Sequence, residues 1–347
     1  MVLEGLKDSM KFGGTGMVKL GLKIGPEQYT PSEMLRQTIA AEESGYDSID
    51  VSDHFHPWSE EGQSCFTWTW LGAAAARTKK IELGTGLTCP ILRYNPAIIA
   101  QAAATVSSLA GGRTYLGVGT GEALNEYPVT CEWPEYSERQ EMLAEAINLI
   151  RELWSGEKVS FDGIHYCTHE AKLYTLPARD IPIYISTMVP ESAQFAGYHG
   201  DGLLTVGGFK MKIYKQIMEK FGNGVKRAGK DLTNMPRTVE LFVAYGERLE
   251  ESMEKMHKYW AGSFIPALFT NKIYTPEMSQ QNGEVVGYDI LKQKACISSD
   301  PEEQARYVQQ YIDAGFTHIY IHYAGPDELG FIKSYAEDVF PLIRKHT

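Results

Sequence analysis

Short apolar segments that favour β-strands alternate with longer segments of helical periodicity along almost the whole chain. Alternation of this kind is typical of parallel sheets, in which each helix carries the chain back to the start of the next strand. Eight strands are expected, at residues 18–25, 48–55, 81–90, 114–122, 181–187, 202–208, 238–246 and 317–325. The sequence therefore predicts an α/β fold of the (β/α)8 barrel type, with a doubly wound open sheet as the alternative.

The turn after the first expected strand favours the barrel over the open sheet. It reads "KIGPEQY" and lacks the glycine-rich pattern with which such an open sheet cradles a pyrophosphate. Residues 17–347 are expected to form a single barrel domain with insertions near 157–180 and 250–310. The first insertion contains an Asp-Gly turn signal, which indicates a hairpin. Residues 1–16 are expected to be a flexible N-terminal extension.

The 347 residues carry a net charge of −11, and this balance bears on the partners of the protein. Binding to nucleic acid needs a basic stripe, and none is visible. No run approaches the roughly 18 consecutive apolar residues of a membrane span. The five cysteines lack the paired spacing of zinc sites and disulfide frameworks, which indicates reduced thiols in a cytoplasmic protein. We therefore expect a small-molecule substrate, no nucleic-acid partner, no membrane and no metal.

Polar side chains follow several expected strands at the point where each strand ends. Because the carboxyl ends of all strands in a parallel barrel meet at one mouth, these side chains are expected to lie together. They are Glu27 after the first strand, Asp53 and His54 after the second, Thr88 and Cys89 after the third, Glu122 and Asn125 after the fourth, and Ser186 and Thr187 after the fifth. A single polar strand end is common, but four in succession that carry ionisable or amide groups indicate a functional site.

The stretch "SDHFHPW" at residues 52–58 allows three interpretations. A metal site is the weakest, because the two histidines have no matching cluster of ligands elsewhere. A structural role, with Asp53 capping a turn, is the second. The third is a catalytic base, since a neutral His54 at the mouth suits proton abstraction at about pH 7 and Trp58 can line the pocket beside it. We favour His54 as the base.

Two further stretches are candidates for binding a cofactor. "GVGTGEALNE" (117–126) is rich in glycine at a strand end, which would let the backbone approach a flat cofactor with Glu122 at its edge. "STMVPES" (186–192) places hydroxyl groups and backbone amides before a helix. That arrangement predicts either an anion site or an ordinary helix N-cap, and the sequence does not decide between them.

Four blocks in order, "VSDHFHPW", "RYNPAIIAQAAAT", "GVGTGEALNE" and "VTCEWPE", resemble the deazaflavin (coenzyme F420)-dependent dehydrogenases of the bacterial luciferase-like superfamily. The similarity runs from about residue 18 to the C-terminus. It implies a luciferase-like, TIM-like barrel with insertions, coenzyme F420 as the cofactor, and a homodimer.

The resemblance also implies roles for the residues at the mouth. His54 would take the hydroxyl proton of the substrate while the C–H hydride passes to C5 of the deazaflavin. Trp58 and Glu27 would help to hold the substrate oxygen. Glu122 would protonate or stabilise N1 of the reduced ring, and Asp53 would fix the ring and the strand end around His54.

The coenzyme contacts implied by the resemblance include a non-prolyl cis peptide bond behind the ring and backbone groups around the phosphate tail. The full expected set is Asp53, Gly86, Leu87, Thr120, Gly121, Glu122, Asn125, Ser186, Thr187, Met188 and Val189, with the cis bond at Gly86-Leu87. The family often has glycine at the position of Thr187 or Val189, so this chain departs from the pattern at the tail.

Two branches of that family differ at the substrate site: glucose-6-phosphate dehydrogenases and secondary alcohol dehydrogenases. The sugar-phosphate branch uses lysines, an arginine and a histidine, because a dianion needs several cations. Here Phe209 replaces the first lysine, Ile273 replaces the histidine and Lys294 replaces the arginine. The expected substrate residues are Trp58, Val206, Phe209, Lys272, Ile273 and Lys294. We expect a secondary alcohol as substrate, with a sugar phosphate as the alternative and, in another class, an FMN-dependent luciferase-like monooxygenase.

Overall fold

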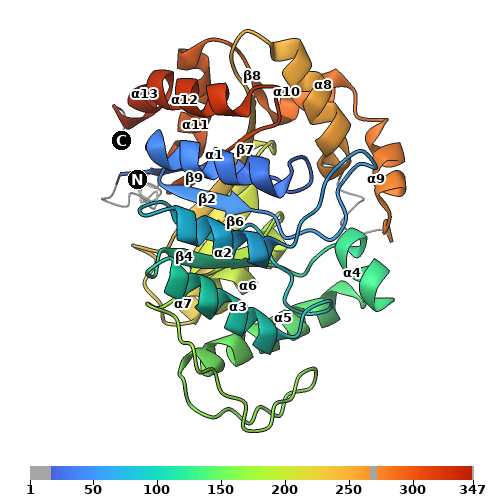
Figure 1. Ribbon diagram of the computed structural model, residues 1–347, viewed down its shortest axis with the longest axis vertical. Coiled ribbons are helices and arrows are strands. Elements are labelled where there is room, and N and C mark those ends of the chain that lie inside the picture. The colour runs from blue at the N-terminus through green and yellow to red at the C-terminus, as the bar shows by residue number, and fades with distance from the viewer. Residues whose placement is uncertain (1–16, 266–271, 346–347) are drawn as a thin grey trace, which may run out of the picture.

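The computed structural model describes residues 17–265 and 272–345, and its centre is a closed barrel of parallel strands (Figure 1). Each strand from β1 to β7 pairs with the next along the chain, and β9 lies between β7 and β1 and closes the ring. The strands are β1 (Lys19–Ile24), β2 (Ser48–Val51), β3 (Glu82–Thr85), β4 (Thr114–Val118), β5 (Ile183–Ser186), β6 (Gly202–Val206), β7 (Arg237–Ala244) and β9 (His318–Tyr323). The (β/α)8 barrel is confirmed. The expectation for residues 1–16 lies outside the described residues.

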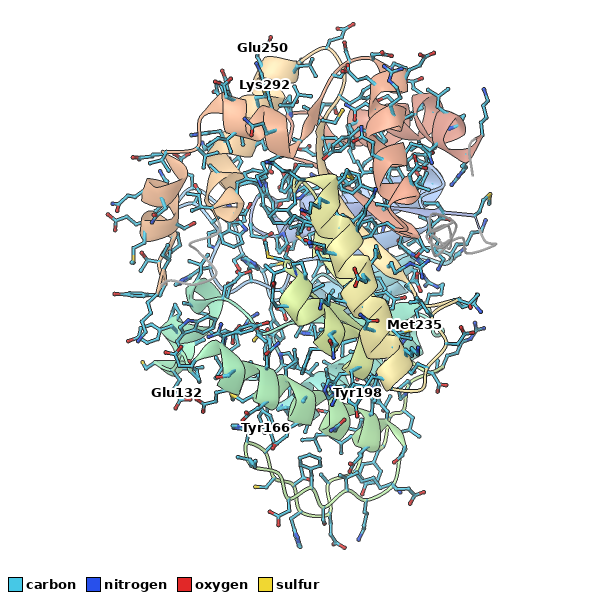
Figure 2. All side chains as sticks on the ribbon, turned by 180° about the vertical axis from the view of Figure 1, so that it is seen from behind. Glu132, Tyr166, Tyr198, Met235, Glu250 and Lys292 are labelled. Carbon is cyan, nitrogen blue, oxygen red and sulfur yellow. The ribbon has the colours of Figure 1, made fainter. Side chains whose placement is uncertain are left out.

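The helices surround the barrel on its outer face (Figure 1). They are α1 (Pro31–Glu43), α2 (Thr67–Arg77), α3 (Pro96–Leu109), α4 (Ala123–Thr130), α5 (Tyr136–Trp154), α6 (Pro190–His199), α7 (Met211–Arg227), α8 (Leu249–Trp260), α9 (Pro276–Gly283), α10 (Tyr288–Lys294), α11 (Pro301–Asp313), α12 (Glu328–Asp338) and α13 (Phe340–Arg344). From behind, α6 and α7 lie side by side across the sheet (Figure 2). None of the described helices is both long and apolar enough to cross a membrane.

Local sequence signals fix where the first helix begins and ends. The Thr30 hydroxyl accepts a hydrogen bond from the Glu33 amide, and the Glu33 carboxylate accepts one from the Thr30 amide at 2.8 Å. This capping box satisfies two amides that the helix leaves free, and Pro31 occupies the first helical position, where an amide is not needed. The helix stops before Gly45, whose φ of +81° is accessible to glycine. Glu27, in the turn before the helix, is thereby placed at the mouth of the barrel.

Three tyrosines fill the barrel near the N-terminal ends of its strands. Each stands beside a glycine on the neighbouring strand, and a Cβ on that glycine would lie 2.3 to 2.5 Å from the tyrosine ring. The pairs are Tyr320 with Gly21, Tyr115 with Gly84, and Tyr184 with Gly202. The tyrosine rings occupy the space that the glycines leave free and close the barrel at the N-terminal ends of its strands. The functional site is therefore expected at the C-terminal ends.

A buried charged layer lies above the tyrosines. Lys23 of β1 is level with Asp50 of β2 and His322 of β9. Its Nζ lies 2.9 Å from Asp50 Oδ2 and 3.6 Å from Glu240 Oε2, and it also donates to the carbonyl of Gly86. Burial alone would lower the pKa of Lys23, but the two carboxylates outweigh burial and raise it. The layer therefore holds a permanent ammonium inside the barrel.

The first insertion, at residues 157–180, extends below α5 (Figure 1). Antiparallel bridges, including one between Asp162 and Cys167, confirm its hairpin character. Glu145 of α5 anchors the turn, because its carboxylate accepts hydrogen bonds from the backbone amides of Ile164 and the residue after it, at 2.8 and 2.9 Å.

The second insertion lies between β7 and α11. It consists of α8, the 3-10 turn η1 (Ala261–Phe264), α9, α10 and the short strand β8 (Cys296–Ile297), which pairs with the C-terminal end of β7. Trp260 at the end of α8 donates a hydrogen bond from Nε1 to Gln28 Oε1 at 2.8 Å. Gln28 in turn donates to the carbonyl of Ala324 after β9, at 3.0 Å. The insertion is therefore fastened directly to the mouth of the barrel.

The charged layer generates a prediction about stability. Replacing Lys23 with Met leaves the carboxylates of Asp50 and Glu240 buried without their cation, and we expect a loss of about 3–5 kcal/mol in the free energy of unfolding. Urea denaturation at neutral pH measures this loss. Lys19→Met on the same strand removes only an exposed ion pair with Glu82 and should cost less than about 1 kcal/mol. Equal losses for the two variants would contradict the role given to Lys23.

Candidate active site

His54 lies directly after β2 at the mouth, and its side chain is 10% exposed. Its Nδ1 is 3.1 Å from the carbonyl oxygen of His56. A carbonyl only accepts, so Nδ1 carries the hydrogen in the neutral ring and Nε2 holds the free lone pair. Burial lowers the pKa of His54, although the Glu122 carboxylate raises it in part. The residue is thus a neutral base with its basic atom defined.

Glu27 approaches the same ring nitrogen of His54, Nδ1, as the His56 carbonyl. The distance from Glu27 Oε1 to His54 Nδ1 is 3.4 Å, and the Glu27 side chain is 1% exposed. Among the described residues, neither of its carboxylate oxygens meets a hydrogen-bond donor in good geometry. Burial raises the pKa of Glu27 from its ordinary value of 4.5 to about 7, against the attraction of Lys23. At neutral pH this carboxyl is therefore poised between its acid and its anion.

Glu122 approaches His54 from β4. Its Oε2 lies 3.6 Å from His54 Nε2 and accepts a hydrogen bond from Asn125 Nδ2 at 3.2 Å. Burial raises the pKa of Glu122, and the nearby carboxylate of Glu27 adds to the rise. Asn125 also accepts hydrogen bonds from the amides of Phe55 and the residue after it, at 2.8 and 3.1 Å. Asn125 thereby connects the loop that carries His54 to Glu122, which faces Nε2 of His54.

An apolar cluster covers one side of His54. The Trp58 ring lies with its centroid 5.0 Å from that of His54, and Trp58 is 5% exposed. It belongs to a cluster that the second insertion builds over the mouth. The other buried members are Leu124, Phe242, Met256, Trp260, Ala261, Ile273, Val286, Leu291, Ala295 and Ala324. This wall excludes water from the side of His54 on which it lies.

Asp53 supports the site from behind. Its carboxylate accepts hydrogen bonds from the hydroxyl groups of Thr88 at 2.8 Å and Tyr94 at 3.0 Å, and it pairs with Arg93 at 3.4 Å. Arg93 also pairs with the fully buried carboxylate of Glu126 at 3.2 Å. Both carboxylate oxygens of Asp53 are engaged within the protein, which locks the end of β2 to the segments after β3. The sequence analysis missed Arg93 and Glu126, although a cation in the apolar "ILRYNP" was the available signal.

The ends of β3, β4 and β5 form a half-buried rim beside His54. The residues of this rim are Gly86, Leu87, Thr120, Gly121, Glu122, Ser186 and Met188. The Gly86-Leu87 peptide bond is cis, as the resemblance implied. A Cβ on Gly86 would lie 2.0 Å from Asp50 Oδ2, and Gly121 has a φ of +73°. Glycine backbone on this rim, with the unpartnered carboxyl of Glu27 beside it, fits a flat ring with a polar edge.

The expected tail contacts lie at the end of β5. Thr187 is buried, its hydroxyl donates to the carbonyl of Val189 at 2.8 Å, and it hydrogen-bonds the Ser192 hydroxyl. Val189 is the N-cap of α6 and has no side-chain cap bond. The first turn of α6 therefore keeps its free backbone groups directed toward the mouth.

The expected substrate residues fall into two groups. Ile273 is buried in the cluster with Trp58, whereas Lys272 beside it is exposed. Phe209 lies past the end of β6, where the Nζ of Lys294 stands 4.6 Å from the centre of its ring. Half-buried Val206 ends β6, and its carbonyl accepts a hydrogen bond from a tyrosine of α7. None of the described contacts brings Lys272 and Lys294 together.

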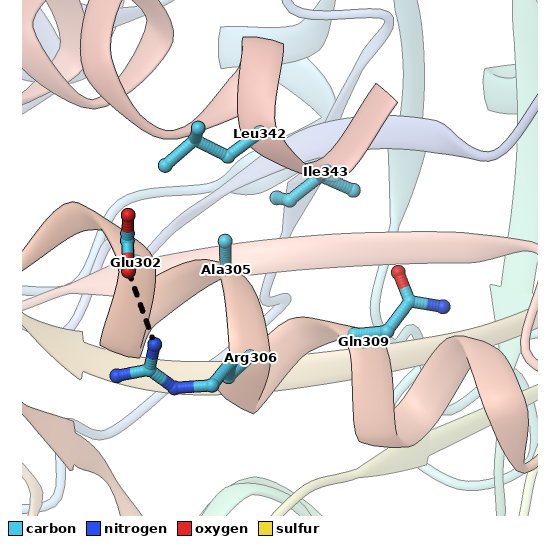
Figure 3. A pocket seen from close by; sticks show the side chains of 6 residues that line it. All are labelled: Glu302, Ala305, Arg306, Gln309, Leu342 and Ile343. Atoms are coloured by element: carbon cyan, nitrogen blue, oxygen red, sulfur yellow. Dashed lines mark hydrogen bonds and ion pairs between the residues drawn. The ribbon is translucent and has the colours of Figure 1, made fainter. Parts of the chain in front are cut away.

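One cavity of the described chain lies away from His54, and another opens beside it. A pocket of 510 Å³ lies between α11 and α13, and its one internal ion pair joins Arg306 to Glu302 at 3.4 Å (Figure 3). A pocket of 460 Å³ opens beside His54, between Cys65, Leu92 and the end of α4. Within the described ranges, no group of three or more His, Cys, Asp or Glu side chains is placed to hold a metal ion.

Comparison with known proteins identifies the relatives of this arrangement. A family model described as luciferase-like monooxygenase matches residues 10–318. The F420-dependent glucose-6-phosphate dehydrogenase of Amycolatopsis mediterranei (strain U-32) is 38% identical, over 94% of this chain and 99% of its own. The enzyme of the same name from Kineococcus radiotolerans is 39% identical, over 94% of this chain and 97% of its own.

Solved structures show the same relationship. An F420-dependent secondary alcohol dehydrogenase in complex with an F420-acetone adduct matches with a TM-score of 0.90 and 38% identity, over 94% of this chain and 99% of that chain. The coenzyme F420-dependent tetrahydromethanopterin reductase from Methanopyrus kandleri shares the fold, with a TM-score of 0.77 at 20% identity.

The unpartnered carboxyl of Glu27 generates a prediction about pH. Its pKa is higher in the folded than in the unfolded chain, so its contribution to stability is full below about pH 4.5 and is lost as the pH rises through about 7. At about 1.4 kcal/mol per pKa unit, the loss amounts to about 3 kcal/mol. Glu27→Gln imitates the protonated form. Its free energy of unfolding, compared with that of the wild type, should therefore rise by about 3 kcal/mol as the pH increases from about 4.5 to above 7.

Urea denaturation of both proteins across the pH range measures the difference. Glu60→Gln, an exposed glutamate on the loop after β2, is the matched control and should follow the wild type at every pH. Parallel curves for Glu27→Gln and the wild type would show that folding does not shift the pKa of Glu27.

Proposed function

The chain belongs to the luciferase-like family and lies among its coenzyme F420-dependent dehydrogenases, and on this premise we propose that it transfers a hydride between a secondary alcohol and coenzyme F420. The observation that carries the proposal is the neutral His54, which stands between two carboxyl groups and beside the apolar cluster that contains Trp58. A base that accepts one proton in an apolar pocket suits an uncharged alcohol.

His54 acts as the base at a defined atom. Nε2 takes the hydroxyl proton of the alcohol, because Nδ1 is engaged as a donor to the His56 carbonyl. The imidazolium that forms lies 3.4 Å from Glu27 and 3.6 Å from Glu122, and these carboxyl groups stabilise its charge. In ketone reduction the same atom returns the proton to the carbonyl oxygen.

Glu122 and the rim serve the coenzyme. When bound, coenzyme F420 supplies the acceptor for the hydride that leaves the carbinol carbon. Burial raises the pKa of Glu122, which eases the uptake of a proton by its carboxylate, and this carboxyl group would exchange that proton with the edge of the ring. Gly86, Leu87, Thr120 and Gly121 would hold the ring. Ser186 to Val189 would hold the phosphate tail.

The charges around the substrate pocket favour an alcohol over a sugar phosphate. A phosphate dianion is bound by several converging cations. Lys210 and Lys272 are exposed, while the ammonium of Lys294 lies over Phe209, where burial lowers its pKa. Phe209 and Ile273 therefore replace charge with apolar surface at two positions.

A sugar phosphate is the second candidate, because the curated relatives at 38% and 39% identity are named as glucose-6-phosphate dehydrogenases. An FMN-dependent oxygenation is the candidate from another class, since the family model carries that activity in its description. The two dehydrogenase candidates share His54, Glu27 and Glu122, so they differ only in what fills the pocket.

The substrate is tested by following the loss of visible absorbance of oxidised coenzyme F420 with purified protein. We expect bleaching with 2-propanol and none with glucose-6-phosphate. Bleaching with the sugar phosphate alone would overturn the alcohol assignment and would mean that Lys272 and Lys294 converge on an anion. A protein that binds FMN and not the deazaflavin would overturn the cofactor as well.

The role of His54 is tested by its replacement with Gln. We expect kcat to fall by about 10²- to 10⁴-fold, because the proton acceptor is lost while the shape of the pocket remains. Coenzyme affinity, measured by fluorescence titration, should stay near that of the wild type. His169→Gln, an exposed histidine of the first insertion, is the control and should leave both quantities unchanged. A kcat for His54→Gln within tenfold of the wild type would exclude His54 as the base.

A further inference from the structure

Arg139 is a buried cation that forms no salt bridge among the described residues, although the carboxylate of Glu135, just before α5, acts on its charge from a distance. It lies in the first turns of α5 and is 4% exposed. Its guanidinium stacks over the Trp133 ring at 3.7 Å, and one Nη donates to the carbonyl of Pro134 at 2.6 Å. Among the described residues, its Nε has no acceptor and no carboxylate forms an ion pair with it. Arg139 is therefore left with a desolvated charge and an unused donor.

The other buried arginines of the chain have an acceptor for Nε, unlike Arg139. Arg93 pairs with two buried carboxylates. Arg237, at the closed end of the barrel, donates to the backbone carbonyls of Gly315, Leu232 and Met235 at 2.7 to 3.2 Å. An unpaired buried charge costs several kcal/mol, and the positive end of the α5 dipole adds to the cost at Arg139. An anion beside Arg139 would remove both penalties.

The topology places Arg139 on the coenzyme side of the barrel. A helix runs antiparallel to the strands, so the N-terminal end of α5 lies at the mouth; in Figure 2 this end is close to the labelled Glu132. Arg139 and the thiol of Cys89 are close enough to influence each other's ionisation. Cys89 in turn lies against Gly121, since a Cβ there would be 2.5 Å from its Sγ. Arg139 therefore stands behind the rim formed by the ends of β3 and β4.

The neighbouring end of β5 is connected to the same place. Tyr136, one turn before Arg139 on α5, interacts with Ser192 in the first turn of α6. Ser192 is bonded to Thr187 and to the carbonyl of Val189. The open first turn of α6 and the guanidinium of Arg139 thus border the region between the ends of β4 and β5.

We propose that Arg139 is the counter-ion and hydrogen-bond donor for the anionic phosphate tail of the bound coenzyme. The inference rests on the proposed function, because it takes the deazaflavin as the ligand. Arg139 contributes to affinity and not to the chemical step, since it touches none of His54, Glu27 or Glu122. It supplies the side-chain cation that the backbone groups at the end of β5 lack.

The test compares two ligands and three variants of the full chain. Fluorescence titration gives the Kd for coenzyme F420 and for the same deazaflavin without its phosphate tail. For Arg139→Gln we expect the Kd of the complete coenzyme to rise by about 10- to 100-fold, the loss typical of a charge-assisted hydrogen bond. The Kd of the tail-less ligand should change by less than about twofold. Arg139→Lys, which keeps the charge but not the fork, should recover part of the loss.

Arg151→Gln is the matched control on the same helix. Arg151 lies about 18 Å further along α5 by helical rise and pairs with Asp201 at 2.8 Å. Its replacement by Gln therefore removes the same charge far from the rim. We expect its Kd values to match the wild type for both ligands. The melting temperature adds a second readout: Arg139→Gln without coenzyme should melt no lower than the wild type, because an unpaired buried charge is gone.

Each alternative result has a separate meaning. If Arg139→Gln weakens the binding of both ligands equally, Arg139 only supports the fold of the rim. If the affinity for the complete coenzyme is unchanged, the phosphate tail lies elsewhere. Either result overturns the inference and leaves the cofactor assignment in place. If Arg139→Gln does not fold, the Arg139→Lys variant decides by the same comparison. A wild type that binds neither deazaflavin would overturn the proposed function together with the inference.

Discussion

The ammonium of Lys23 is the interaction on which the upper half of the barrel depends. It stands on β1, reaches Asp50 on β2 and Glu240 on β7, and donates to the carbonyl of Gly86 at the end of β3. Burial of one cation between two carboxylates is tolerated only because every member is satisfied, and the geometry fixes the register of these strands. Without that register, the strand ends that carry the active site would have no common position.

The same layer sets the charge of the site above it. The Lys23 ammonium and the hydrogen bond with the His322 ring hold the pKa of Glu240 at about 2 against the effect of burial, so the charge of Lys23 is balanced by that carboxylate and by Asp50. Glu27 is left without a hydrogen-bonded partner in the described chain, and burial raises its pKa to about 7. With the pKa of Glu122 raised and that of His54 lowered, the mouth tends toward neutral forms. A nearly neutral mouth is suited to an uncharged substrate.

Much of the fold was predictable from the sequence because its signals are local. Apolar periodicity located all eight strands of the ring, and the parallel topology then required the residues after them to converge, as Glu27, His54 and Glu122 do. The pairing of Lys23 with Glu240 was not predictable, because it depends on the register of strands far apart in the sequence. Arg139 gave no signal at all, since an arginine on an amphipathic helix is normally solvated.

The second insertion shows why substrate and chemistry can vary separately in this fold. The hydrogen bond from Trp260 to Gln28, the residue next to Glu27, fixes the insertion at the mouth of the barrel. Phe209, past the end of β6, lies against Lys294 at the end of α10 in the insertion, and none of the described contacts joins either residue to His54. A change at Phe209 can therefore alter this region without moving His54, and such a separation is consistent with relatives that share one coenzyme but are named for a secondary alcohol or for glucose-6-phosphate.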